Sequence, residues 1–161
     1  MREETHLTTD PWSYSLSANS QKSQFIDLGQ KNLTPPDWSQ VRIGSKRPPV
    51  IYETHLRDAS ALETTPLNQG RYRAISDSTS LFHRHLKRLA EAGLTHLHLL
   101  PVFDFGSVPE VRSDWSTAVI PGGLQRDSFT PQEAIGKVRL QDSYNWGYDP
   151  VNYNCPEGSY S

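Results

Sequence analysis

The sequence predicts an α/β fold in which two parallel strands are joined by a helix. Val50–Asp58, VIYETHLRD, is rich in residues that favour strands and follows two prolines. Residues 78–93, STSLFHRHLKRLAEAG, have the apolar spacing of an amphipathic helix. Residues 94–101, LTHLHLLP, have the pattern of a second strand that ends at a proline. A strand, helix and strand in this order almost always form a right-handed crossover between parallel strands.

The predicted helix has a start signal, a stop signal and one apolar face. Ser78 or Ser80 can cap its N-terminus, and Gly93 stands where a left-handed residue is wanted at the C-terminus. Residues at i, i+3 and i+4 spacing form the apolar face, namely Phe82, Leu86, Leu89 and Ala90. This face is expected to pack against the two strands.

The first predicted strand carries charge on one side. Alternation over 50–58 places Glu53, His55 and Arg57 on one face, opposite Tyr52, Thr54 and Leu56. An open parallel sheet with helices on both sides seldom accepts such a face, whereas a closed barrel with a polar lumen can. A solvent-exposed face is the alternative.

The two flanking regions have weaker patterns. Residues 1–49 are polar and broken by prolines, with one short strand-like run at Ser23–Gly29. Residues 106–161 contain no further element beyond a possible helical turn at Thr130–Val138, TPQEAIGKV. A connection of some 50 residues is far longer than ordinary strand-to-helix loops, so we expect it to be functional.

Composition argues against several classes of partner. The formal net charge is −2, with acidic and basic residues interspersed, so we expect neither nucleic acid nor an anionic membrane surface as a partner. No run of about 18 apolar residues predicts a membrane span. The single cysteine, Cys155, cannot form an intrachain disulfide, and it is expected to be a small loop residue and not a reactive thiol.

Two His-x-His pairs have residue types that can bind a metal ion. On a strand His96 and His98 share a face and could chelate one ion, but His83 and His85 on a helix point about 200° apart. No third ligand is evident near either pair, so hydrogen-bonded histidines are the favoured interpretation. We expect no metal and no cofactor.

Four carboxylates attract attention as candidate acids or bases. Asp58 and Asp104 follow the two predicted strands, at the end where parallel α/β folds place ligands. Asp149 and Glu157 lie near the C-terminus. A carboxylate after a strand is more often a turn or capping residue than a catalyst, and the sequence does not show any two of these facing each other across a bond.

The C-terminal stretch 144–161, YNWGYDPVNYNCPEGSYS, combines aromatic rings with helix-breaking prolines and glycines. Aromatic faces bury the C–H face of a sugar ring, and adjacent Asn and Asp side chains can bind hydroxyls. The alternative is that the rings only pack the loop against its own scaffold.

Four stretches follow one another along the chain: TDPWSYSLSANSQKSQFIDL (9–28), VIYETHLRDAS (50–60), LAEAGLTHLHLLPVFDF (89–105) and YNWGYDPVNYNCPEGSYS (144–161). In this order they resemble pullulanase-type starch-debranching enzymes of glycoside hydrolase family 13, including plant limit dextrinases. The resemblance implies a partial (β/α)₈ TIM barrel over 50–161, with its first two strands, first helix and the long loop after the second strand. It also implies that 1–49 are the end of a preceding β-sandwich domain and a linker.

The resemblance further implies retaining hydrolysis of α-1,6-glucosidic bonds in pullulan, limit dextrins, starch or glycogen. Tyr148 would stack on the sugar just before the scissile bond. The same pocket wall would be shaped and hydrogen-bonded by Trp146, Asn145 and Asp149. The family's three catalytic carboxylates lie on later strands, so no catalytic residue is expected here and the 161 residues alone should be inactive. The alternative is a non-catalytic carbohydrate-binding remnant.

Overall fold

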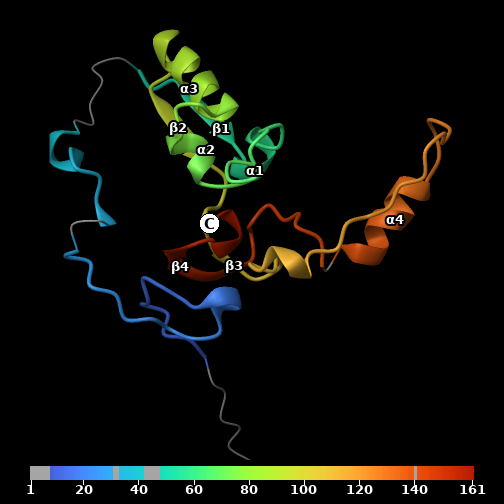
Figure 1. The fold of residues 1–161 in the computed structure, drawn as a ribbon, viewed down its shortest axis with the longest axis horizontal. Coiled ribbons are helices and arrows are strands. Elements are labelled where there is room, and N and C mark those ends of the chain that lie inside the picture. The colour runs from blue at the N-terminus through green and yellow to red at the C-terminus, as the bar shows by residue number, and fades with distance from the viewer. Residues whose placement is uncertain (1–7, 31–32, 42–47, 140) are drawn as a thin grey trace, which may run out of the picture. The chain divides into compact units, whose positions relative to one another are not determined.

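The computed structural model describes residues 8–30, 33–41, 48–139 and 141–161. They form two compact units, one of the described residues up to Ser23 together with Pro101–Ser161, and the other of Gln24–Leu100 (Figure 1). Both helices and strands are present, so the chain is a mixed α/β structure, as predicted. No helix in the described ranges is long and apolar enough to span a bilayer.

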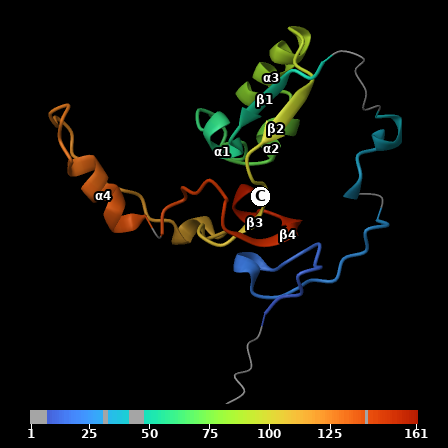
Figure 2. The same cartoon turned by 180° about the vertical axis from the view of Figure 1, so that it is seen from behind.

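The unit of Gln24–Leu100 contains the predicted strand, helix and strand. Strand β1 (Ile51–Thr54) pairs in parallel with β2 (His96–Leu99), with Ile51 opposite His96. Helix α3 (Leu81–Glu91) lies between them in sequence, after the short helices α1 (Leu56–Ala59) and α2 (Arg73–Ser76). Helices α2 and α3 cover one face of the strand pair, as the front and back views show (Figure 1 and Figure 2). The predicted parallel pairing is confirmed.

Helix α3 begins and ends where its sequence signals predict. The hydroxyl of Ser80 accepts a hydrogen bond from the His83 backbone N–H (3.1 Å), and Gly93 has a left-handed φ of 110°. Buried Glu63 adds support that the sequence did not reveal, because its Oε1 accepts from the Ser80 hydroxyl (2.7 Å) and the Phe82 backbone N–H (2.8 Å). Burial alone would raise the pKa of Glu63, but these hydrogen bonds outweigh it and lower the pKa.

The first strand is shorter than predicted. It ends at Thr54, and the chain turns into α1, where the Ala59 N–H donates to the His55 carbonyl (2.9 Å). His55 and Leu56 are both buried, so the in-and-out alternation stops there and Glu53, His55 and Arg57 do not share a face. Within the strand, Glu53 is more than half exposed and lies 2.9 Å from Nδ1 of His98.

The other unit, which contains Pro101–Ser161 and is called here the second unit, is built on an antiparallel pair of strands that the sequence did not predict. Strand β3 (Phe103–Phe105) pairs with β4 (Pro150–Pro156), and register shifts interrupt the pairing on both sides of Asp104. The rings of Phe105 and Tyr160 meet edge to face at 5.8 Å in its small core. Helix α4 (Thr130–Val138) confirms the predicted helical turn.

Residues 10–23 lie beside the β3–β4 strand pair. The side-chain amide of Asn152 donates to the Asp10 carbonyl (3.1 Å), and the Cys155 thiol donates to the Ser13 carbonyl (3.1 Å). Cys155 is therefore a buried strand residue rather than a loop residue, and burial raises the pKa of its thiol. The prediction of a strand-like run at Ser23–Gly29 is wrong. In this run only Ser23 forms a β-bridge, to Leu16, and Phe25 is fully exposed.

Candidate functional site

The predicted binding residues lie on one ordered loop, Tyr144–Asp149, called here the aromatic loop. The side-chain oxygen of Asn145 accepts a hydrogen bond from the Gly147 N–H (2.9 Å), which closes a tight turn. Gly147 is left-handed (φ 82°), and a Cβ there would lie 2.8 Å from Cβ of Pro101 and 2.9 Å from the Phe105 ring. Conformation and space both require glycine at this position.

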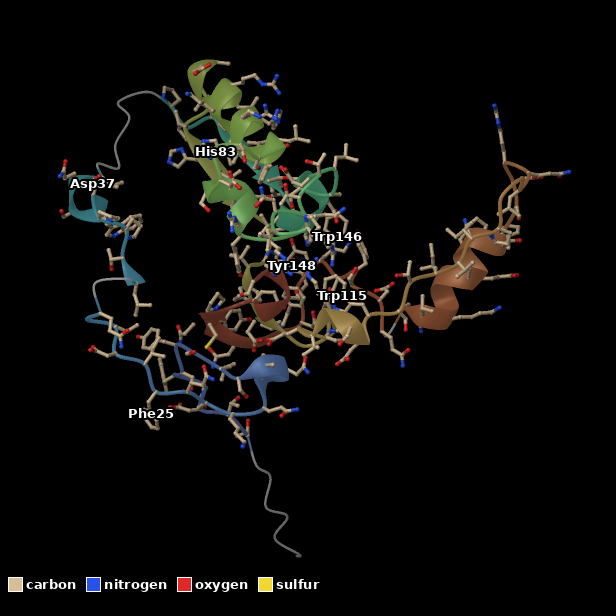
Figure 3. The ribbon with its side chains drawn as sticks, in the orientation of Figure 1. Phe25, Asp37, His83, Trp115, Trp146 and Tyr148 are labelled. Atoms are coloured by element: carbon tan, nitrogen blue, oxygen red, sulfur yellow. The ribbon has the colours of Figure 1, made fainter. Side chains whose placement is uncertain are left out.

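The rings of the aromatic loop are open to solvent. Tyr148 is 70% exposed and Trp146 is 49% exposed, and the Trp146 ring meets the Tyr144 ring edge to face at 6.2 Å. Figure 3 shows Trp146 and Tyr148 on the same loop of the second unit. Rings this exposed contribute little to the core, which weakens the interpretation that they merely pack the loop against its scaffold.

Asp149 ties the aromatic loop to the end of β3. Its Oδ1 accepts from the Asn145 side-chain amide (2.8 Å), and its Oδ2 accepts from the Ser107 hydroxyl. Its carbonyl accepts from the Gly106 N–H (3.2 Å). Sequence reasoning missed Ser107, which is 42 residues away, because nothing in the local pattern reveals the β3–β4 pairing that brings it there.

An open pocket of about 690 Å³ lies next to the residues that hold Asp149, in the same unit. Ser107 takes part in both features, since its hydroxyl binds Asp149 and it also lines the pocket. The other polar lining residues come from the N-terminal segment and from the chain after β3, and they are Asn19, Ser20, Glu110 and Asp114. The volume lies within the range of ligand pockets in proteins.

Three carboxyls at the β3–β4 strand pair form a compact group, called here the carboxyl cluster: Asp104, Glu110 and Glu157. Glu157 is fully buried, and it accepts from the Phe105 N–H (3.0 Å) and the Ser159 N–H (2.8 Å). Asp104 is buried and accepts from the Ser20 hydroxyl (2.8 Å to each oxygen). Within the described ranges none of the three forms an ion pair with a cationic side chain.

Burial controls the charge of the carboxyl cluster. It raises the pKa of Asp104, of Glu110 and of Glu157 above the usual value of each group. Repulsion from neighbouring carboxylates raises the pKa of Glu110 and Glu157 further, and a hydrogen bond between Glu110 and Asp104 stabilises one protonated carboxyl of that pair. Two of the candidate acids, Asp104 and Glu157, thus belong to a buried structural cluster.

The remaining candidates are dispersed. Asp58 is half exposed, with Nδ1 of His55 at 3.7 Å and Nε of Arg57 at 3.9 Å. His96 pairs through Nδ1 with the Thr95 hydroxyl (2.8 Å), and His98 pairs with Glu53. The two histidines therefore make separate contacts, and the described part of the chain holds no group of three metal-binding side chains.

The aromatic loop and the sequence around it have clear relatives. The chain is 38% identical over 172 residues to pullulanase 1, chloroplastic, of Arabidopsis thaliana, and the match covers all of this chain. It is 32% identical over 201 residues to a pullulanase of Klebsiella pneumoniae, with 98% of this chain covered. The chain resembles one segment of the pullulanases. It spans 18% of the length of each of these two relatives.

Solved pullulanase structures agree with this relationship. A Klebsiella pneumoniae pullulanase complexed with maltotriose superposes with a TM-score of 0.78 at 31% identity, covering 98% of this chain and 19% of that one. No protein-family model matches the chain. The pullulanase relationship confirms the resemblance predicted from the four sequence stretches.

Proposed function

We propose that this chain is a segment of a pullulanase-type glycoside hydrolase that cleaves α-1,6-glucosidic bonds in branched α-glucans with retention of configuration. The observation that carries the proposal is the similarity to pullulanases over nearly the whole chain. Its role is to supply one wall of the glucan-binding cleft, and the catalytic carboxylates lie outside it. Pullulan, limit dextrins, starch and glycogen branch points are the proposed substrates.

The fold proposed for the parent is a (β/α)₈ barrel that begins in this chain. Strands β1 and β2 would be its first two strands and α3 its first helix, which agrees with their parallel pairing. The aromatic loop would belong to the long connection that follows the second barrel strand in the sequence. Residues 1–49 would be the end of a β-sandwich and a linker, with 50–161 in the catalytic domain.

The aromatic loop has the chemistry that a sugar ring needs. The exposed face of Tyr148 can stack on the C–H face of a glucose residue, with Trp146 beside it. Each oxygen of Asp149 accepts one hydrogen bond from the protein and keeps a lone pair for a sugar hydroxyl. The side-chain amide of Asn145 donates to the Asp149 carboxylate and holds it in place. Maltotriose, the ligand of the Klebsiella pneumoniae structure, is the natural probe.

The candidate acids Asp58, Asp104 and Glu157 are poorly placed for glycoside cleavage. A retaining enzyme needs two carboxyls facing each other across the bond, one of them ionised. Asp104 and Glu157 are buried and accept hydrogen bonds from Ser20, Phe105 and Ser159. Asp58 is an exposed residue of a short helix. This supports a binding role for the segment.

The test is to measure hydrolysis of pullulan by the complete protein that contains this sequence, together with maltotriose binding by calorimetry. We expect release of reducing sugar with the initial product in the α configuration, and saturable maltotriose binding. Binding without any hydrolysis would favour the non-catalytic carbohydrate-binding remnant. Absence of both would overturn the proposed function.

A further inference from the structure

We propose that Ser107 is a positioning residue for the aromatic loop. Its hydroxyl holds the Asp149 carboxylate, and it thereby fixes the orientation in which Trp146 and Tyr148 are presented to a glucan. This inference rests on the proposed function, because it explains how the proposed binding wall is held. It assigns Ser107 an indirect role, through Asp149, with no contact to the sugar.

The first support is that two consecutive residues after β3 bind the same residue of the aromatic loop. The Gly106 N–H donates to the Asp149 carbonyl at 3.2 Å, and the Ser107 hydroxyl donates to its carboxylate. Asp149 is thus held by its main chain and its side chain at once. Hydrogen bonds to a carboxylate are shorter and about twice as strong as those between neutral groups, so Ser107 makes the stronger of these two anchors.

The second support is that the Asp149 carboxylate also closes the loop internally. Asn145 donates to its Oδ1 (2.8 Å) and accepts from the Gly147 N–H (2.9 Å), so one amide side chain connects three positions of the turn. Trp146 and Tyr148 lie between these fixed positions in the sequence. If the carboxylate swings away from Ser107, the Asn145–Asp149 hydrogen bond is lost with it, and the turn that carries both rings is less well held.

The third support is space. Because Gly147 has no Cβ, the Phe105 ring and Pro101 can lie close to its backbone. The turn therefore packs against the end of β3, next to Ser107. The loop is therefore held both by an apolar contact at Gly147 and by the Ser107 hydrogen bond at Asp149. Removing the hydroxyl should release the loop without unfolding the hairpin, because Ser107 itself is exposed.

The rival explanation is that Ser107 touches the sugar directly, since it also lines the 690 Å³ pocket. Variants of the complete protein separate the two. Ser107→Ala removes the donor, and Ser107→Thr keeps it. Ser113→Ala is the matched control, because Ser113 is another exposed serine that donates to a carboxylate, Asp114 (3.2 Å), outside the aromatic loop.

Maltotriose binding is measured by calorimetry for each variant and for Ser107→Ala combined with Asp149→Ala. We expect Ser107→Ala to weaken binding about tenfold, the size of one charge-assisted hydrogen bond, while Ser107→Thr and Ser113→Ala bind like the parent. In the Asp149→Ala background the Ser107 change should have no further effect, since Ser107 acts through that carboxylate. The unfolding temperature is followed in parallel.

Three results would overturn the inference. One is unchanged binding in Ser107→Ala, another is failure of Ser107→Thr to restore it, and the third is a full tenfold loss in the Asp149→Ala background. Failure of the proposed function looks different: the unaltered protein would then bind no maltotriose, and Tyr148→Ala would change nothing.

Discussion

Asn19 and Glu110, 91 positions apart in sequence, hold each other by two reciprocal hydrogen bonds. The Asn19 N–H donates to Oε2 of Glu110 (2.9 Å), and the Glu110 N–H donates to Oδ1 of Asn19 (2.9 Å). Asn19 has a left-handed φ of 55°, a conformation that asparagine tolerates better than most residues. This pair fastens the turn Ala18–Ser20 to the carboxyl cluster.

Asn19→Ala should loosen this turn. The change removes one hydrogen bond and adds strain at positive φ, so we expect the exchange protection of the Glu110 amide to fall about tenfold. Amide hydrogen exchange in the complete protein measures it. Asn19→Gly removes the same bond without the strain and should fall less far. Asn154→Ala is the control, because its amide makes only a long contact to the Pro11 carbonyl (3.4 Å). Equal protection in all four proteins would contradict the prediction.

The carboxyl cluster should make the unit that contains β3 and β4 less stable as the pH rises. The pKa of Asp104, Glu110 and Glu157 is raised in the folded state, so the folded chain binds more protons than the unfolded chain. The stabilisation is complete below the unfolded values, at about pH 4, and is lost as the pH rises through the raised folded values. The pH dependence is therefore opposite to that of an acid in a salt bridge.

Protection factors of the Asn19 and Phe105 amides, measured between pH 4 and pH 8 and corrected for intrinsic exchange, check this. They should decrease with pH in the unaltered protein. Glu110→Gln replaces a titrating group of the cluster by a neutral one, so its curve should be flatter. Glu133→Gln, on helix α4, serves as the control and should keep the original slope. A protection factor that increases with pH would exclude this account.

Tyr148→Ala should weaken glucan binding about tenfold, because an exposed ring that stacks on a sugar loses its apolar contact. Maltotriose calorimetry and kcat/KM on pullulan with the complete protein are the measurements. Tyr14→Ala is the matched control, since Tyr14 is also an exposed tyrosine of the same unit but lies outside the aromatic loop. Equal losses in both variants would show that the effect is not specific to the loop.

The 161 residues alone should be marginally stable and inactive on pullulan. Among the described residues each sheet has two strands, and few apolar residues are buried: Leu56, Ala74, Phe82, Phe105, Val108, Cys155 and Tyr160. Thermal unfolding and a reducing-sugar assay test this. A sharp cooperative transition, or turnover that disappears on changing Asp58, Asp104 or Asp149 to Asn, would prove the prediction wrong.

The elements that the sequence predicted well are those whose causes lie within a few residues. Ser80 caps α3 and Gly93 follows its end, and both signals are local. Strand β4 escaped prediction because Pro150 and Pro156 suggested an irregular loop, yet they stand at its two ends, where a missing N–H does little harm. The end of β1 was misplaced because burial of His55 and Leu56 overrode the alternation of the pattern.

By itself the sequence determined the α3 helix, the parallel β1–β2 pair, the pullulanase-like character and the aromatic loop as a candidate glucan site. Only the tertiary structure revealed the Ser107–Asp149 hydrogen bond, the Asn19–Glu110 pair and the carboxyl cluster. The physical reason is separation along the chain. Caps and apolar periods act over one or two helical turns, whereas these contacts depend on how β3 pairs with β4 and on where residues 10–23 lie beside them, which leaves no periodic trace in the sequence.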